Sequence, residues 1–200
     1  EDVLIRLKAE ETAARQAYVA AAAALTGARE KAALRLEKSV AAELPPLKLE
    51  KARIRPRLEA VSEEHWGDEG REKIIFEVAT NPGQPFGPLS RIASGGELAR
   101  FMLALKVVLA ATDPVPTLVF DEVDSGIGGA AAAAVGSRLA RLATGAQVLV
   151  ITHSPQVAAL GEHHWQVSKS GSGNGKDKVL TTVDILDAAA RTEEIARMLA

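Results

Sequence analysis

The chain has 200 residues, 47% of them hydrophobic, and a formal net charge of −2 at pH 7. This balance gives no general attraction to nucleic acid or to a membrane, so either contact would need a local patch. The complete lack of cysteine excludes disulfides, thiolate catalysis and cysteine-based metal sites, and it fits a cytoplasmic protein.

No apolar run approaches the ~20 residues of a membrane-spanning helix, so we expect no membrane partner. The sequence opens on Glu1 rather than on methionine, and it opens already in a helical pattern. We therefore expect the chain to be part of a longer protein.

Residues 1–43 predict one long helix, because they contain no proline, a single glycine and many strong helix formers. At 1.5 Å per residue it would be about 60 Å long, too long for a small domain to cover. We favour one arm of an antiparallel coiled coil whose partner lies outside this chain; a surface helix of a globular domain stays open as the alternative. Side chains recurring at alternating steps of three and four support the arm. They are Leu4, Leu7, Ala14, Tyr18, Ala21, Leu25, Ala28 and Ala32.

Leu44-Pro45-Pro46 ends the helix, and the pattern then changes to the alternation of β-strands. Strands are predicted over 52–58 and 73–79, and Pro56 places the first at a sheet edge. Beyond them, short apolar strands alternate with helices, which predicts an α/β domain with a partly parallel sheet. Its functional crevice should lie at the carboxyl ends of the strands. The later predicted elements are a helix from 98 to about 111, a strand over 117–120, a helix over 130–142, a strand over 147–151, a hairpin of 165–168 with 179–185, and a helix over 191–199 with Thr192 as candidate N-cap.

Ser94-Gly95-Gly96-Glu97 precedes the apolar helix. A serine with a glutamate three residues later is a capping box, which explains Ser94 and Glu97 without a ligand. The two glycines are not explained by the cap. They would expose backbone N–H groups at a helix N-terminus, where an anion such as a phosphate is favoured.

Asp121 and Glu122 follow the apolar strand over 117–120. Adjacent carboxylates repel, so the pair is costly unless a cation or proton is shared. In phosphoryl transfer such acids hold Mg²⁺ and orient or deprotonate the attacking water. An ordinary strand-end turn with exposed acids is the alternative.

Asp124 opens a glycine-rich loop that ends at Gly129, and its side chain could cap or bridge. His153 follows the second apolar strand, over 147–151. It would lie at the same sheet edge as the acids if the two strands are neighbours. A strand-end histidine is more often structural than catalytic, but here an imidazole could contact a terminal phosphate.

Together, the order and spacing of these segments resemble the ATP-binding cassette (ABC) family. Ser94 to Glu97 is similar to its signature motif, Leu118 to Glu122 to its Walker B strand, Asp124 to its D-loop and His153 to its switch histidine. The implied fold is the C-terminal lobe of an ABC-type P-loop ATPase head, a mostly parallel sheet flanked by helices and preceded by a long coiled-coil helix.

Four longer segments narrow the resemblance to the RecN family of bacterial DNA repair proteins, which are similar to structural maintenance of chromosomes (SMC) proteins. The match spans roughly residues 44–200, as the head lobe, and residues 1–43 fit the returning coiled-coil arm. An SMC-type chromosome organiser, in which architecture is the function, stays open; a transporter ATPase domain fits poorly. The four segments are Ala79 to Gly83, Ala93 to Leu98, Phe120 to Gly129 and Ile151 to Ala158.

No acceptable phosphate loop is present in the sequence, although the family requires Gly-x-x-x-x-Gly-Lys followed by Ser or Thr. The lookalike, Gly171 to Asp177, has its glycines one residue too close and Asp177 in place of the hydroxyl residue. The resemblance implies that this Walker A loop lies in an N-terminal lobe, without which the chain should bind ATP poorly.

The resemblance implies a mechanism in which two heads sandwich two ATP molecules with Mg²⁺. Head dimerisation would be coupled to tethering of DNA double-strand ends at the bacterial nucleoid, with the recombinase RecA as a further partner. A modest basic group, Arg53, Arg55, Arg57, Arg71 and Lys73, is the candidate DNA patch, although a solvated strand face is the favoured interpretation. The resemblance implies that Ser94, Gly95, Gly96 and Glu97 contact the γ-phosphate in the opposite subunit's site. Asp121 would bind Mg²⁺, Glu122 would activate the attacking water, and His153 would contact the γ-phosphate. Asp124 would link the two sites.

Overall fold

The computed structural model describes residues 1–89, 94–110, 112, 115–170 and 180–200. Contacts divide the chain into two compact units. One contains Glu1–Glu43 with Lys51–Ile92, and the other contains Leu44–Glu50 with Ala93–Ala200. The Walker A lookalike, Gly171 to Asp177, lies outside the described residues. So do Asp113 and Pro114, which follow the helix predicted from 98 to about 111.

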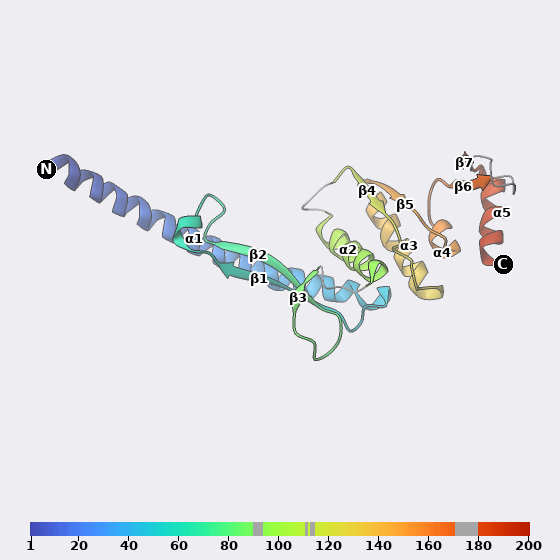
Figure 1. The fold of residues 1–200 in the computed structure, drawn as a ribbon, viewed down its shortest axis with the longest axis horizontal. Helices are drawn as coiled ribbons and strands as arrows, with labels where there is room; N and C mark the ends of the chain where they lie inside the picture. Colours follow the sequence, from blue (N-terminus) through green and yellow to red (C-terminus); the bar gives the residue numbers. More distant parts are fainter. Residues whose placement is uncertain (90–93, 111, 113–114, 171–179) are drawn as a thin grey trace. The chain divides into compact units, whose positions relative to one another are not determined.

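The first unit pairs the long helix α1 (Asp2–Glu43) with an antiparallel sheet of β1 (Arg53–Ala60), β2 (Glu72–Ala79) and β3 (Gly87–Pro88). α1 runs along β1, and its N-terminal end extends past the strands (Figure 1). The prediction of a single helix ending before Leu44 is confirmed. The sheet order β1-β2-β3 also confirms that the strand containing Pro56 is an edge strand.

Only part of the predicted apolar stripe on α1 contacts the sheet. Residues 2–17 are all exposed, and Leu4 and Leu7 expose 58% and 52% of their surface. Further along, Ala22 and Val40 are buried, and Ile54 of β1 is 1% exposed. The exposed first turns therefore present apolar side chains that no described residue of this unit covers.

A polar and aromatic clamp joins α1 to the loop between β1 and β2. The Tyr18 ring stacks on Trp66 with centroids 5.6 Å apart, and the Tyr18 hydroxyl lies 3.0 Å from the carbonyl oxygens of Gly67 and Gly70. On the same side, an Arg15 guanidinium nitrogen lies 2.7 Å from a Glu63 carboxylate oxygen. This loop therefore fixes the helix against the hairpin near the middle of α1.

The second unit is built around α2 (Gly95–Leu109), β4 (Thr117–Phe120), α3 (Gly129–Ala143) and β5 (Gln147–Val150). β4 and β5 pair in parallel, in a register from Thr117 opposite Gln147 to Phe120 opposite Val150. α3 packs against β5 and against α2. The short 3₁₀ turn Pro45–Leu47 also packs on α3. Side chains that are at most 5% exposed form the core of this unit: Leu44, Leu47, Phe101, Leu103, Ala104, Val123, Ala132, Val135, Leu139, Leu142 and Val157.

The chain continues through α4 (Pro155–Ala158), the antiparallel hairpin of β6 (Trp165–Ser170) and β7 (Leu180–Ile185), and α5 (Ala188–Leu199). The α/β class and the predicted hairpin are confirmed. The prediction that Thr192 caps the last helix is wrong. The helix begins one turn earlier, because the Asp187 carboxylate accepts a hydrogen bond from the Ala190 N–H, and Thr192 donates to the Ala188 carbonyl.

Across the described parts of the chain, no helix combines the length and apolarity that crossing a membrane requires.

Replacing Tyr18 with Phe should lower the free energy of unfolding by about 1 kcal/mol, because the ring stack remains while the hydroxyl donor to the Gly67 and Gly70 carbonyls is lost. Urea unfolding of the chain, followed by circular dichroism, measures the change. Thr12→Val is the matched control, since the Thr12 hydroxyl only donates to the Lys8 carbonyl of its own exposed helix face. Equal stability of Tyr18→Phe and wild type would show that the clamp carries no net energy.

Candidate functional site

The signature-like segment forms the start of α2. Ser94 is the N-cap, and its hydroxyl oxygen accepts a hydrogen bond from the Glu97 N–H at 3.5 Å, so the capping half of the predicted box is confirmed. Ser94 and Gly95 are exposed, whereas Gly96 is buried. The helix therefore begins at two solvent-accessible residues, Ser94 and Gly95, and the helix dipole favours an anion at this end.

Gly96 has a structural reason to be glycine. A Cβ built there would lie 3.0 Å from the Ser125 carbonyl oxygen and 3.2 Å from an Arg100 guanidinium nitrogen. The same Arg100 nitrogen, Nη1, donates to the Ser125 carbonyl oxygen at 2.9 Å. Arg100 is 6% exposed, and burial lowers the pKa of its guanidinium, an effect that nearby Glu97 partly offsets. The first turn of α2 thus packs directly on the loop that follows β4.

The predicted acid pair lies at the carboxyl end of β4. Asp121 and Glu122 are both exposed. Glu122 adopts φ +56°, a left-handed conformation that costs a residue with a side chain free energy and that is often found at functional sites. A Cβ on Gly95 would lie 3.1 Å from the Glu122 carboxylate, so this acid and the start of α2 are neighbours.

Asp124 is fully buried, with 0% of its surface exposed. Its Oδ2 accepts hydrogen bonds from the Thr152 hydroxyl and from the Ser154 N–H, the latter at 3.2 Å. The Ser154 N–H also lies 2.9 Å from the Thr152 hydroxyl oxygen. These two partners flank His153, which is itself exposed. The buried position of the Asp124 carboxylate differs from the expectation of a residue that contacts a second subunit.

The structure therefore brings together three of the segments singled out in the sequence. The start of α2, the loop after β4 and the loop after β5 are joined through Ser125 and Asp124. Sequence reasoning missed Arg100 and Thr152. The available signals were an arginine within an otherwise apolar helix and a threonine directly before the strand-end histidine.

Mg²⁺ prefers carboxylate oxygen ligands and usually keeps several waters. The exposed Asp121 suits this role as a single ligand. No cluster of three or more His, Asp or Glu side chains that could hold a metal occurs among the described residues. A cation here would need its remaining ligands from water, a nucleotide or another chain segment.

Two apolar faces of the second unit are exposed. On the β4–β5 pair, Val119, Leu149 and Ile151 expose 63%, 37% and 60% of their surface. On one face of the β6–β7 hairpin, two cross-strand pairs of apolar side chains expose 57–77% of their surface. The pairs are Trp165 with Ile185 and Val167 with Val183. Exposed apolar faces of this kind mark interaction sites.

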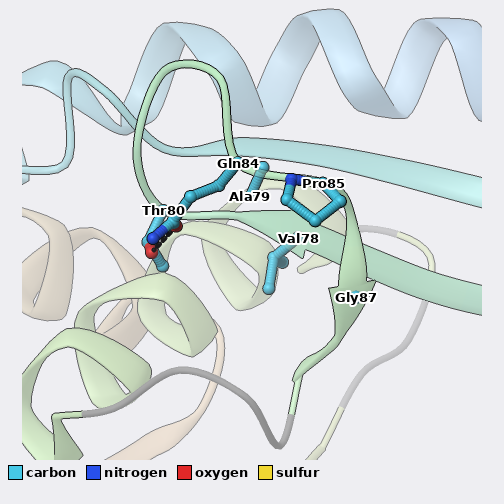
Figure 2. Close-up of a pocket in the computed structure, with 6 residues that line it drawn as sticks. All are labelled: Val78, Ala79, Thr80, Gln84, Pro85 and Gly87. Carbon is cyan, nitrogen blue, oxygen red and sulfur yellow. Dashed lines mark hydrogen bonds between the residues drawn. The ribbon is translucent and has the colours of Figure 1, made fainter.

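A shallow pocket lies elsewhere, at the end of β2 (Figure 2). Thr80 and Gln84 bond to each other across it, with 3.0 Å between Oγ1 and Oε1. None of the predicted site residues lines it; the lining residues are Val78, Ala79, Thr80, Gln84, Pro85 and Gly87.

The candidate basic patch is partly neutralised. Arg55 and Arg57 both bond to the Glu77 carboxylate, at shortest distances of 2.7 Å and 2.9 Å, and these hydrogen bonds lower the pKa of Glu77. Arg53 and Arg55 also lie over the Phe86 ring. These contacts favour the solvated strand face over a dedicated DNA-binding patch.

Replacing Gly96 with Ala should lower the free energy of unfolding by about 1–3 kcal/mol, because the new methyl group overlaps Ser125. Gly27→Ala is the control, for which the free energy of unfolding should rise instead of fall. Gly27 also lies in a helix, but a Cβ there meets nothing within 4 Å, so alanine should stabilise by about 0.5–1 kcal/mol. Urea unfolding measures both variants. A Gly96→Ala protein as stable as Gly27→Ala would contradict the close packing.

Comparison with known proteins gives the family. No family model matches the chain. The DNA repair protein RecN of Streptomyces coelicolor is 42% identical, over 96% of this chain and 35% of that protein. RecN of Deinococcus radiodurans is 45% identical, over 88% of this chain and 30% of that protein. The chain thus spans about a third of the length of these curated relatives.

Among solved structures, the Smc head domain with a coiled coil and joint derived from Pyrococcus yayanosii is similar, with a TM-score of 0.55. The two are 19% identical, over 82% of this chain and 29% of that chain, so the likeness concerns the fold. The RecN proteins are 38–53% identical to this chain, so its relation to RecN is stronger than its likeness to the Smc head. This chain belongs to the RecN family and corresponds to the C-terminal part of its members.

Proposed function

We propose that this chain is one lobe of an ATP-hydrolysing head that acts in DNA double-strand break repair. One observation carries the proposal. β4 and β5 are adjacent parallel strands, and an exposed acid pair follows the first while an exposed histidine follows the second. The carboxyl edge of parallel strands is where α/β proteins bind ligands and perform chemistry.

The proposed roles follow from the chemistry of each side chain. Asp121 would bind Mg²⁺, which supplies charge neutralisation on the phosphates. Glu122 would orient the attacking water and accept its proton, and its exposed carboxylate has the access to solvent that this role needs. His153 would contact the terminal phosphate through its exposed imidazole.

A phosphate loop must come from another part of the protein. The chain spans about a third of its relatives' length, and the exposed apolar faces of β4–β5 and of the hairpin offer a surface for further structure. We infer that an N-terminal lobe carrying the Walker A loop packs on these faces in the complete protein. The chain alone should then bind and hydrolyse ATP poorly.

The exposed start of α2 would serve a second head. Ser94 and Gly95 present a helix N-terminus to solvent, which suits the γ-phosphate of ATP held by another copy. ATP would then join two heads in a homodimer, and hydrolysis would separate them. Because the relatives are DNA repair proteins, we propose that this cycle acts on double-strand ends at the nucleoid, with RecA as a further partner.

The architectural alternative is favoured by a different observation. The first turns of α1 expose Val3, Leu4, Ile5 and Leu7, by 52–63%, as a coiled-coil arm would before it meets its partner helix. In that case tethering by the arms would be the function and ATP turnover would be slow.

Glu122→Gln in the full-length protein should abolish ATP turnover while ATP-dependent head dimers persist, because the amide cannot accept the water's proton. DNA-stimulated phosphate release and size-exclusion chromatography with ATP are the measurements. Glu193→Gln, on an exposed face of α5, is the control. Wild-type turnover in Glu122→Gln would remove Glu122 from this role. Turnover by the isolated chain would contradict the split head.

Ser94→Arg should block ATP-dependent dimerisation without weakening ATP binding to one head, since a long cation would fill the surface offered to the partner's nucleotide. Ser94→Ala separates this effect from loss of the helix cap, which costs about 1 kcal/mol. Fluorescent ATP binding and sedimentation velocity read the two properties. Dimers of normal stability in Ser94→Arg would rule out the signature assignment.

A further inference from the structure

We propose that Asp124 is a positioning residue, which ties the loop carrying Glu122 to the loop carrying His153 by acting as a buried hydrogen-bond acceptor. This inference rests on the proposed ATPase function. It replaces an interfacial or ligand-binding role for Asp124 by a role within the chain.

The Asp124 carboxylate is buried within its own chain. The Asp124 side chain is 0% exposed, so its carboxylate cannot reach a nucleotide, a metal or a second subunit without rearrangement. A buried carboxylate is costly unless hydrogen bonds compensate it. Here both observed bonds converge on Oδ2, while Oδ1 is buried without a partner among the described residues. Oδ2 alone therefore accepts both hydrogen bonds that connect Asp124 to the loop after β5.

The two donors to Asp124 lie on either side of His153. Thr152 and Ser154 are the immediate neighbours of His153, and both are bound to the same atom. Their shared acceptor fixes the backbone on both sides of the exposed imidazole. Any displacement of Asp124 would therefore move His153 as well.

The loop that contains Asp124 is also bound to α2. Ser125, the next residue after Asp124, accepts a hydrogen bond from the buried Arg100 and packs against Gly96 of α2. The segment from Glu122 to Ser125 is thus held by α2 on one side and by the His153 loop on the other. A shift of the first turn of α2 would be transmitted to both Glu122 and His153, and Asp124 is the link to the latter.

The contact requires an acceptor and not a negative charge, which makes it testable by isosteric replacement. In the full-length protein, Asp124→Ala and Thr152→Val should each lower kcat for ATP about 10- to 100-fold with little change in KM, because a small misplacement of catalytic groups has effects of this size. Asp124→Asn should restore kcat to within about threefold of wild type, since its amide oxygen can accept both bonds. Thr152→Ser should do the same.

The double variant Asp124→Ala with Thr152→Val should be no worse than the more affected single variant, as expected for residues that act through one contact. Thr144→Val is the control, because that hydroxyl only donates to the Arg141 carbonyl at the end of α3. If Asp124→Ala fails to fold, the comparison of kcat between Thr152→Val and Thr152→Ser tests the same contact.

Three outcomes would overturn the proposal. If Asp124→Asn loses as much turnover as Asp124→Ala, the charge is required, as for a metal or interfacial role. If Thr152→Val keeps wild-type kcat, the contact has no influence on the reaction. If the two single losses multiply in the double variant, the residues act separately. Failure of the proposed function itself would be distinct: wild-type protein without turnover, or an active Glu122→Gln.

Discussion

The parallel pairing of β4 with β5 is the constraint on which the candidate site depends. The two strands are separated in sequence by the whole of α3, and only their pairing in register brings the residues after Phe120 next to those after Val150. The alanine-rich helix α3 forms the crossover between them and packs on α2 and β5. A shift in this register would separate the acid pair from the histidine, and the proposed roles of both require them to be neighbours.

Contacts on both sides of the loop after β4 hold this loop in place beside the loop after β5. On one side there is no room for a side chain at Gly96, and the buried Arg100 holds a backbone carbonyl. On the other side, Asp124 satisfies donors from the next strand end. Exposed Asp121 and Glu122 thus stand on a support that is itself buried. Rigid support beneath accessible reactive groups is what positioned chemistry requires.

Local signals in the sequence predicted much of this arrangement, and the failures have physical causes. The Ser94 cap, the strand ends and the long helix follow from short-range patterns, and the structure has them. The buried state of Asp124 could not be predicted, because it depends on donors 28 and 30 residues away. The start of the last helix was missed because Thr192 and Asp187 are both acceptable caps, and only the tertiary position of the turn chooses between them. For Gly96, a phosphate was the expected reason for glycine, whereas packing within the chain is sufficient.

The left-handed backbone of Glu122 has an evolutionary consequence. A conformation with φ +56° suits glycine or asparagine better than glutamate, and holding glutamate there costs roughly 1–3 kcal/mol. Directed evolution that rewards thermal tolerance alone would therefore tend to replace this acid, and under the role proposed for Glu122 the more stable variants would lose ATP turnover. Under the role proposed for Glu122, glutamate at this position exchanges stability for reactivity, so the side chain would be set by the proposed chemistry rather than by the fold.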